Sequence, residues 1–324
     1  MGIVSTLKPR ILFFGTPEFA VICLQKLIET NCQIVGVITS PDRPAGRGKK
    51  LRSSAVKDYA LDNELVLLQP ANLKDPVFIK SLEELKADIA VVVAFRMLPK
   101  SVWSLPSKGT FNLHASLLPQ YRGAAPINWA IANGEKESGV TTFLIDEKID
   151  TGALLLQKKI LLNENETAGS LHDKLAVLGS ELIVETIECI FSDTIRPELQ
   201  EDKEFLKDAP KLTKGNTQVS WNQSLEEIQN FVRAMNPYPG AWVQLSENEA
   251  TIPMKIFEVE IRKEKQAHPQ GTLRVEDREI QIAHPDGWVI CQEIQLPNKR
   301  RMQAKALLNG YVFDENCQIK CLGF

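Results

Sequence analysis

Apolar runs alternate with helical patterns along the first two thirds of the chain. Nearly continuous apolar runs predict strands at residues 10–15, 33–38, 87–94, 111–114 and 140–145. Such runs are typical of strands that are covered on both faces, as in a parallel sheet. Between them apolar positions recur at helical spacing, and a long helix is predicted to begin at Thr167. This alternation predicts a doubly wound, mostly parallel α/β domain.

The pattern changes after the long helix. Residues 192–214 are rich in charge and proline and show no sustained period, which is typical of a linker. Ser224 and Glu227 then form a predicted capping box at the start of an amphipathic helix. The segments that follow alternate apolar and polar residues between turn signals, which predicts a small antiparallel barrel. We therefore expect an α/β domain at 1–195, a linker at 196–212 and a barrel domain at 213–324.

The composition is that of a globular protein and says little about partners. The chain has 324 residues, 38 Lys and Arg against 41 Asp and Glu, and 44% hydrophobic residues. The length exceeds what one hydrophobic core usually holds, in agreement with two domains. The net charge of −3 predicts no overall attraction to nucleic acid, so any such binding needs local basic patches.

Cysteines and apolar segments favour a cytoplasmic protein without a metal. The six cysteines are scattered, and the nearest pair, Cys317 and Cys321, has no further Cys or His close by to complete a zinc site. Free thiols fit a reducing compartment. The longest strongly apolar run, 89–95, is far shorter than the ~20 residues of a membrane-spanning helix. We also expect no signal peptide and a monomeric protein.

Two phosphate-binding motifs are disfavoured. Gly15 follows the first predicted strand, but the segment 15–20 holds one glycine where a dinucleotide fingerprint needs three. Without the second glycine the backbone cannot approach a pyrophosphate closely, which argues against NAD. The sequence also contains no GxxxxGK[ST] motif, so a P-loop is excluded.

The segment 112–127 carries the most informative chemistry. Asn112 and His114 lie two residues apart on a predicted strand, so both project from one face at the edge where doubly wound folds bind ligands. Asp150 lies in an Asp-Thr-Gly sequence between two strand-like runs. A lone His more often packs in a core, and Asp-x-Gly is ordinarily a turn, so only the combination favours a site. An amide that donates to an oxyanion, an imidazole that shuttles a proton and a carboxylate that orients it suit acyl transfer to an amine.

Four segments resemble the methionyl-tRNA formyltransferase family: 14–20, 41–50, 112–127 and 150–152. The resemblance covers nearly the whole chain and implies that the C-terminal domain is an OB-like barrel. It implies 10-formyltetrahydrofolate and initiator methionyl-tRNA as substrates, and it places Arg43 in a tRNA-contacting loop. The positions that match the family's catalytic residues are Asn112, His114 and Asp150. Those that match its folate-binding loop are Ser116, Leu117, Leu118 and Pro119.

Two segments depart from the family's usual pattern. Phe95-Arg96-Met97 stands where a Tyr-Gly stretch is more usual near the folate pocket. Residues 296–301 replace a more usual Gly-Lys turn. Neither departure touches the three catalytic positions.

Two local clusters of basic residues could attract nucleic acid although the net charge of the chain is negative. Between residues 41 and 57 six basic residues stand against one acid, Asp42, and two glycines suggest a flexible loop. A second basic cluster lies in the stretch 294–313, which contains no acid. The residues expected to bind tRNA are Arg43, Arg47, Lys49, Lys50, Lys299, Arg300 and Arg301.

Three functions remain open from the residues themselves. The first is formyl transfer to methionyl initiator tRNA, with Asn112 and His114 holding a tetrahedral oxyanion. The second is formyl transfer to a small amine, such as an amino-sugar nucleotide or glycinamide ribonucleotide, which the basic loop and the extra barrel disfavour. The third is a non-catalytic nucleic-acid-binding protein, and the intact set of candidate catalytic residues argues against it.

Overall fold

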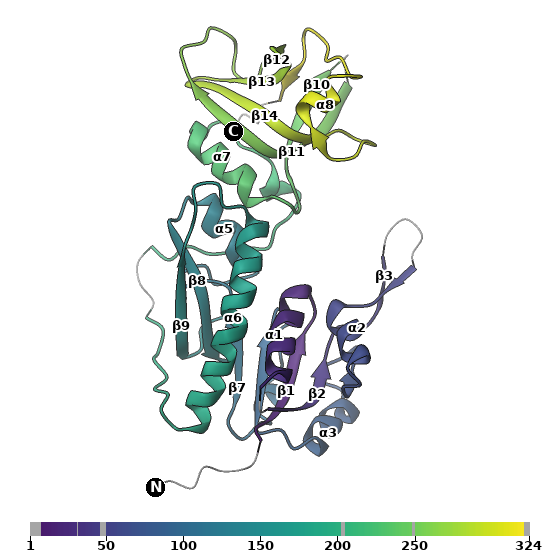
Figure 1. Ribbon diagram of the computed structural model, residues 1–324, viewed down its shortest axis with the longest axis vertical. Coiled ribbons are helices and arrows are strands. Elements are labelled where there is room, and N and C mark those ends of the chain that lie inside the picture. The colour runs from purple at the N-terminus through teal and green to yellow at the C-terminus, as the bar shows by residue number, and fades with distance from the viewer. Residues whose placement is uncertain (1–7, 31, 46–49, 202–204, 248–249, 321–324) are drawn as a thin grey trace. The chain divides into compact units, whose positions relative to one another are not determined.

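The computed structural model describes the chain except for residues 1–7, 31, 46–49, 202–204, 248–249 and 321–324. The chain forms two compact units (Figure 1). The first unit comprises Met1–Gly123, Glu137–Ile160 and His172–Asp208. The second unit comprises Ala124–Lys136, Leu161–Leu171 and Ala209–Phe324. The units therefore interleave along the chain, and the expected domain boundaries at 195 and 213 stay a prediction.

Within the described residues, seven strands form the sheet of the first unit (Figure 1). Their order across the sheet is β5 (Leu67–Leu68), β2 (Gln33–Ile38), β1 (Arg10–Gly15), β6 (Ile89–Val93), β7 (Thr110–His114), β8 (Glu137–Leu144) and β9 (Leu154–Leu161). The pairs β5–β2, β2–β1, β1–β6 and β6–β7 are parallel, whereas β8 runs antiparallel to β7. The expected doubly wound, mostly parallel sheet is confirmed, and its strand order reverses between β1 and β6.

Helices cover both faces of this sheet. The helix α1 (Glu18–Ile28) lies beside α6 (Ala168–Phe191), because the rings of Phe19 and His172 meet edge to face with centroids 5.3 Å apart. On the other face, α3 (Pro76–Glu84) and α4 (Lys100–Trp103) pack on alternate residues of β1 and β6. The helix α2 (Ala55–Asp62) begins at Ser54, whose side chain accepts a hydrogen bond from the backbone of Lys57. The side-chain alternation of the strands thus gives each face its own apolar core.

The second unit is a nearly closed antiparallel barrel with two helices packed together. The helix α5 (Pro126–Ala132) contacts α7 (Leu225–Ala234), which begins at the predicted capping box of Ser224 and Glu227. The backbone N–H of Ile319 donates to Gly271 O at 2.7 Å and brings the last strand next to the first. The barrel order is β12 (Leu273–Glu276), β13 (Glu279–His284), β14 (Gly287–Gln295), β11 (Ala250–Lys263), β10 (Ala241–Glu247) and β16 (Gln318–Ile319), with β15 (Met302–Gln303) beside β14 and α8 (Ala304–Leu307) after it. The predicted barrel and capping box are confirmed.

Candidate active site

Asn112 and His114 lie at the carboxyl end of β7, which pairs with β6, one of the two strands between which the strand order reverses. Asn112 is the register partner of Val92 on β6, so its side chain is on the same face as Val92 and the helix α4. The Oδ1 atom of Asn112 is buried and has no hydrogen-bond partner among the described residues. Leaving a buried polar atom unpaired costs about 1–3 kcal/mol. This oxygen can accept a hydrogen bond from a donor group of a ligand, and an N–H of the same amide can donate one.

The imidazole of His114 is oriented by a backbone carbonyl. Its Nε2 atom lies 2.8 Å from the carbonyl oxygen of Tyr121, and only 7% of the side chain is exposed. A carbonyl only accepts hydrogen bonds, so Nε2 carries the proton and Nδ1 is bare in the neutral ring. Nδ1 lies 3.8 Å from Oδ2 of Asp150. The ring therefore presents its basic nitrogen next to a carboxylate, which stabilises the imidazolium that forms when Nδ1 takes a proton.

Asp150 is held by the backbone of a neighbouring loop. Its Oδ2 atom accepts a hydrogen bond of 2.9 Å from the N–H of Gly123, and its own backbone is left-handed, with φ of 55°. Gly152 explains the Asp-Thr-Gly pattern, since a Cβ atom there would lie 1.7 Å from the carbonyl oxygen of Leu144. The structure thus brings His114 and Asp150 together, as expected. The close approach of the two loops depends on the missing side chain of Gly152 and on the left-handed backbone of Asp150.

The segment Ser116–Pro119 is tied to the first unit by its own polar groups. Ser116 is fully buried, and its hydroxyl donates to Gln120 O at 2.7 Å. The hydroxyl of Thr141 donates to Ser116 O at 2.6 Å and accepts from Leu118 N at 3.1 Å. Gln157 Nε2 donates to Leu118 O at 2.7 Å. These bonds shape the turn after His114, and direct contact of these four residues with a folate stays a prediction.

Several functional groups of this site were not predicted from the sequence. The Tyr121 carbonyl and the Gly123 N–H are backbone groups, and a backbone group leaves no side-chain signature. Gln200 lies in the segment predicted as a linker, and its amide bonds to the loops of both Arg122 and Asp150. A polar residue in a stretch without periodicity carries no signal until the chain is folded.

Arginines gather on and beside a hairpin of the first unit. The strands β3 (Arg43–Ala45) and β4 (Lys50–Arg52) form a separate two-stranded sheet in which Arg43 faces Arg52, and both are exposed. Like charges opposite each other destabilise a hairpin, so a bound anion would relieve the repulsion. Lys57 is already paired with Asp42 at 2.6 Å. Arg47 and Lys49 lie outside the described residues, and Lys50 begins β4.

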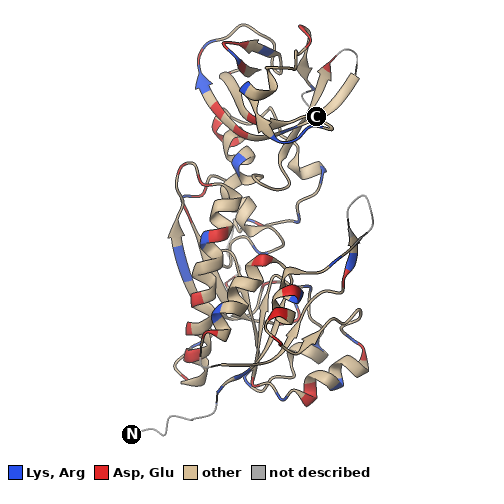
Figure 2. Ribbon diagram, turned by 45° about the vertical axis from the view of Figure 1, so that its right-hand side comes forward, with Lys and Arg blue, Asp and Glu red and all other residues tan. Residues whose placement is uncertain are grey.

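The residues of the second expected basic cluster, Lys299, Arg300 and Arg301, differ in their contacts. Arg301 donates to Glu293 and, at 3.1 Å, to Asn236 Oδ1, and its guanidinium stacks 4.1 Å from the centroid of the Phe257 ring. Lys299 and Arg300 are exposed, and the Lys299 ammonium lies 5.6 Å from the Tyr311 ring. Figure 2 shows basic and acidic residues interleaved along both units. The contacts therefore favour a structural role for Arg301 and leave Lys299 and Arg300 accessible to phosphate.

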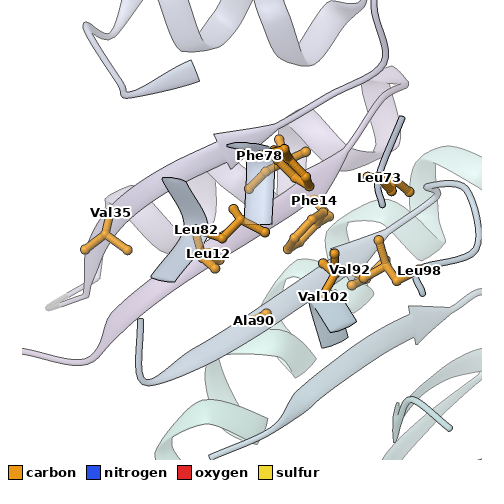
Figure 3. Packing of buried hydrophobic residues seen from close by; sticks show 11 residues of the cluster. Leu12, Phe14, Val35, Leu73, Phe78, Leu82, Ala90, Val92, Leu98 and Val102 are labelled. Carbon is orange, nitrogen blue, oxygen red and sulfur yellow. The ribbon is translucent and has the colours of Figure 1, made fainter. Parts of the chain in front are cut away.

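A cavity of about 630 Å³ opens after β6 and is lined by residues 71–74 and 96–101. Its apolar floor includes Leu73 and Leu98, and Leu98 lies next to Val92 and Val102 in the core (Figure 3). Lys74, Arg96 and Lys100 are its charged lining residues. Since Val93 is the register partner of Leu113, the cavity begins at the same edge of the sheet as Asn112 and His114.

Arg96 lines this cavity and has one hydrogen-bond donor, its Nε–H group, without a partner among the described residues. Its guanidinium donates to the carbonyls of Pro70 and Ala71, whereas its Nε atom is buried and unpaired among the described residues. Burial, and secondly the nearby charge of Arg43, lower the pKa of Arg96. Both effects disfavour the isolated cation, so an anion bound here would stabilise it.

The described residues form neither a metal-binding cluster nor a membrane-spanning helix. They contain no group of three or more His, Cys, Asp or Glu side chains that is arranged to hold a metal ion. They also contain no helix that is both long and apolar enough to cross a membrane.

Comparison with known proteins identifies the family. Residues 9–187 match the formyl transferase family, and residues 211–312 match the formyl transferase C-terminal domain. The chain belongs to the formyl transferase family. It is a formyl-transferring enzyme, and the resemblance seen in the sequence is confirmed.

Curated members of the family are similar to this chain over almost its full length. A methionyl-tRNA formyltransferase of Flavobacterium johnsoniae is 50% identical over 312 residues, which cover 96% of this chain and 99% of the relative. That of Bacteroides thetaiotaomicron is 48% identical and covers 93% and 95%. That of Clostridioides difficile is 42% identical and covers 93% and 96%.

Solved structures of formyl transferases and of HypX share the fold. HypX from Aquifex aeolicus in complex with tetrahydrofolic acid has a TM-score of 0.63 and 18% identity, over 93% of this chain and 47% of HypX. The N-formyltransferase of Helicobacter canadensis, in complex with folinic acid and dTDP-3-aminofucose, has a TM-score of 0.63 and 22% identity, over 88% of this chain and 99% of that protein. At these identities the likeness supports the fold alone.

Proposed function

We propose that this formyl transferase moves the formyl group of 10-formyltetrahydrofolate to the α-amino group of methionyl initiator tRNA. The near-full-length relatives that are 42–50% identical carry the name methionyl-tRNA formyltransferase, which supports this acceptor. The observation that carries the chemistry is the placement of Asn112 on the same strand face as His114, whose Nδ1 lies 3.8 Å from the carboxylate of Asp150.

In the proposed reaction the neutral amine attacks the formyl carbon. A C–N bond forms, the carbonyl electrons move to oxygen, and the Asn112 amide donates a hydrogen bond to that oxyanion. His114 Nδ1 takes the proton that the amine loses, because Nε2 is held by the Tyr121 carbonyl. The negative charge of Asp150 stabilises the imidazolium. Nδ1 then returns the proton to N10 of the folate as the bond between N10 and the formyl carbon breaks.

The cavity after β6 fits the folate better than the buried turn after His114 does. A folate joins a flat ring system to a tail of carboxylates. Leu73, Met97 and Leu98 offer apolar contact to rings, and Lys74 and Arg96 offer charge to carboxylates. We propose that Ser116–Pro119 acts mainly by shaping the site, since its polar groups bond to the protein itself.

Exposed basic side chains of the two units support a tRNA acceptor. We assign phosphate contacts to Arg43 on the hairpin and to Lys299 and Arg300 on the barrel, together with Lys50 and, outside the described residues, Arg47 and Lys49. Phosphate contacts give affinity and orientation without reading sequence. We further propose a cytoplasmic monomer, because substrates of this class are met in the cytoplasm and one chain carries every group that the reaction uses.

An acceptor panel tests the proposed function. The purified protein is given 10-formyltetrahydrofolate and one of four acceptors: charged initiator tRNA, uncharged initiator tRNA, an amino-sugar nucleotide or glycinamide ribonucleotide. We expect formylation of the charged tRNA only. Turnover with a small amine and none with the tRNA would support the small-substrate alternative. Binding of tRNA without any formylation would support the non-catalytic one.

A further inference from the structure

The segment after α6 bonds to loops of the site through its described residues 198–201 and 205–208. At its start, Glu198 and Leu154 exchange two backbone hydrogen bonds of 2.7 and 2.9 Å. Near its end, Lys207 O accepts from Tyr121 N at 2.6 Å, and Lys207 N donates to Gln120 Oε1 at 2.8 Å. The described residues of this segment thus bond to the start of β9 and to the turn that orients His114.

Gln200 connects two of these loops through one amide group. Its Nε2 atom donates to the carbonyls of Asp150 at 2.9 Å and Gly152 at 2.8 Å. Its Oε1 atom accepts from Arg122 Nε at 3.0 Å and from Arg122 Nη2 at 2.8 Å. A primary amide has two donor hydrogens and two acceptor lone pairs, so this side chain is fully bonded.

The position of Gln200 determines what these bonds do. Asp150 has a left-handed backbone, and in this conformation its carboxylate accepts from Gly123 N–H and lies 3.8 Å from His114 Nδ1. Gln200 fixes the two carbonyls that flank this strained turn, and on its other side fixes Arg122, the neighbour of Gly123 in sequence. The two loops that carry the Asp150–Gly123 bond are thereby joined a second time.

The chemistry of the contacts is specific to glutamine. A glutamate would still accept from Arg122 but would place a carboxylate against two carbonyl oxygens, with nothing to donate. An asparagine is one methylene shorter. Glutamine alone among these side chains meets both partners at this reach.

We propose that Gln200 is a positioning residue for formyl transfer, which holds the carboxylate of Asp150 beside His114. The proposal rests on the proposed function for its kinetic test but not for its spectroscopic one. A displacement of about 1 Å in a catalytic group typically costs on the order of 10²-fold in rate. Gln200→Glu, which loses both donors and keeps Arg122, is expected to lower kcat by about 10-fold or more, with KM for both substrates within about 2-fold.

A double-mutant cycle with Asp150→Asn separates positioning from general stability. If Gln200 acts through Asp150, Gln200→Glu costs less than about 2-fold in an Asp150→Asn background, because the carboxylate that it positions is gone. Equal factors in the two backgrounds would overturn the proposal. Gln200→Asn, the shortened amide, shows whether the reach of the side chain matters, and it is expected to resemble Gln200→Glu.

NMR of the histidine side chains tests the proposal without any substrate. The chain contains four histidines, His114, His172, His268 and His284, so their ring nitrogen resonances are separable by NMR. Asp150→Asn is expected to move the His114 ring shifts, Gln200→Glu to move them in the same direction, and neither variant to move the other three. Unmoved His114 shifts in folded Gln200→Glu protein would overturn the proposal even if methionyl-tRNA proved not to be the acceptor.

Discussion

The carboxylate of Asp150 accepts a hydrogen bond of 2.9 Å from the backbone N–H of Gly123. Asp150 lies after β8 and Gly123 lies after β7, so this bond joins the two loops that form the candidate active site. The bond also leaves the Asp150 carboxylate 3.8 Å from Nδ1 of His114. The site therefore depends on backbone conformation as much as on its side chains, and the first prediction concerns that backbone.

Gly152→Ala is expected to destabilise the protein by about 2 kcal/mol or more, because the new Cβ would lie 1.7 Å from Leu144 O and a backbone atom cannot swing away. Urea unfolding measures the change. Gly310→Ala is the matched control, since nothing lies within 4 Å of a Cβ at Gly310. An equal stability of the two variants would contradict the tight turn.

Arg43→Ala is expected to weaken tRNA binding and to reduce the slope of log Kd against log salt by about 1, the effect of one lost phosphate contact. Titration of tRNA at several salt concentrations measures this slope. Lys108→Ala is the control, because Lys108 lies just before β7, at the opposite edge of the sheet from His114. A slope that Arg43→Ala leaves at the wild-type value would remove Arg43 from the phosphate footprint.

Arg301→Ala is expected to lower stability by about 1–3 kcal/mol, since it removes a cation from Glu293 and a stacked stem from Phe257. Its exposed neighbour Arg300 is expected to give less than about 0.5 kcal/mol when changed to Ala. Thermal unfolding of both variants tests this division. The reverse order of the two effects would contradict the structural role of Arg301.

Glu227→Ala is expected to cost about 0.5–1 kcal/mol at neutral pH, because the Glu227 carboxylate accepts from Ser224 N at 2.8 Å in the capping box. The backbone N–H of Ser224, and secondly its hydroxyl, lower the pKa of Glu227 from 4.5. A lowered pKa stabilises the fold above pH 4.5, and this contribution is lost as the pH falls through the folded-state pKa.

The stability gap between wild type and Glu227→Ala should therefore shrink as the pH falls below 4.5 and the carboxylate is protonated. Urea unfolding at each pH measures the gap. A gap that widened on acidification would show that the carboxylate is not the capping species.

Local patterns of the sequence predicted the elements whose cause is local. The strands at 10–15 and 33–38 have the predicted bounds, because buried parallel strands are apolar along their whole length. The capping box at Ser224 was predicted because both partners lie three residues apart. The two-residue strand β5 and the four-residue helix α4 were not predicted, since so few residues contain no period.

Contacts between distant residues account for what the sequence could not predict at the site. Asn112, His114 and Asp150 were singled out by their chemical types and spacing, and their catalytic roles remain predictions. The partners of His114 and Asp150 are a carbonyl and an N–H, which every residue possesses. Arg301 looked like a free cation because its partner Glu293 precedes the acid-free stretch and reaches it only through the pairing of β14 with β15.

The central claim is that the side-chain N–H group of Asn112 donates a hydrogen bond to the oxyanion of formyl transfer. The most direct test is single-turnover formylation of charged initiator tRNA by wild type, Asn112→Ala and Asn112→Asp at saturating 10-formyltetrahydrofolate. Loss of one oxyanion donor typically costs about 10²–10³ in rate, and we predict this loss in both variants with unfolding temperatures within a few degrees of wild type. Rates within about 3-fold of wild type in correctly folded Asn112→Ala protein would contradict the account.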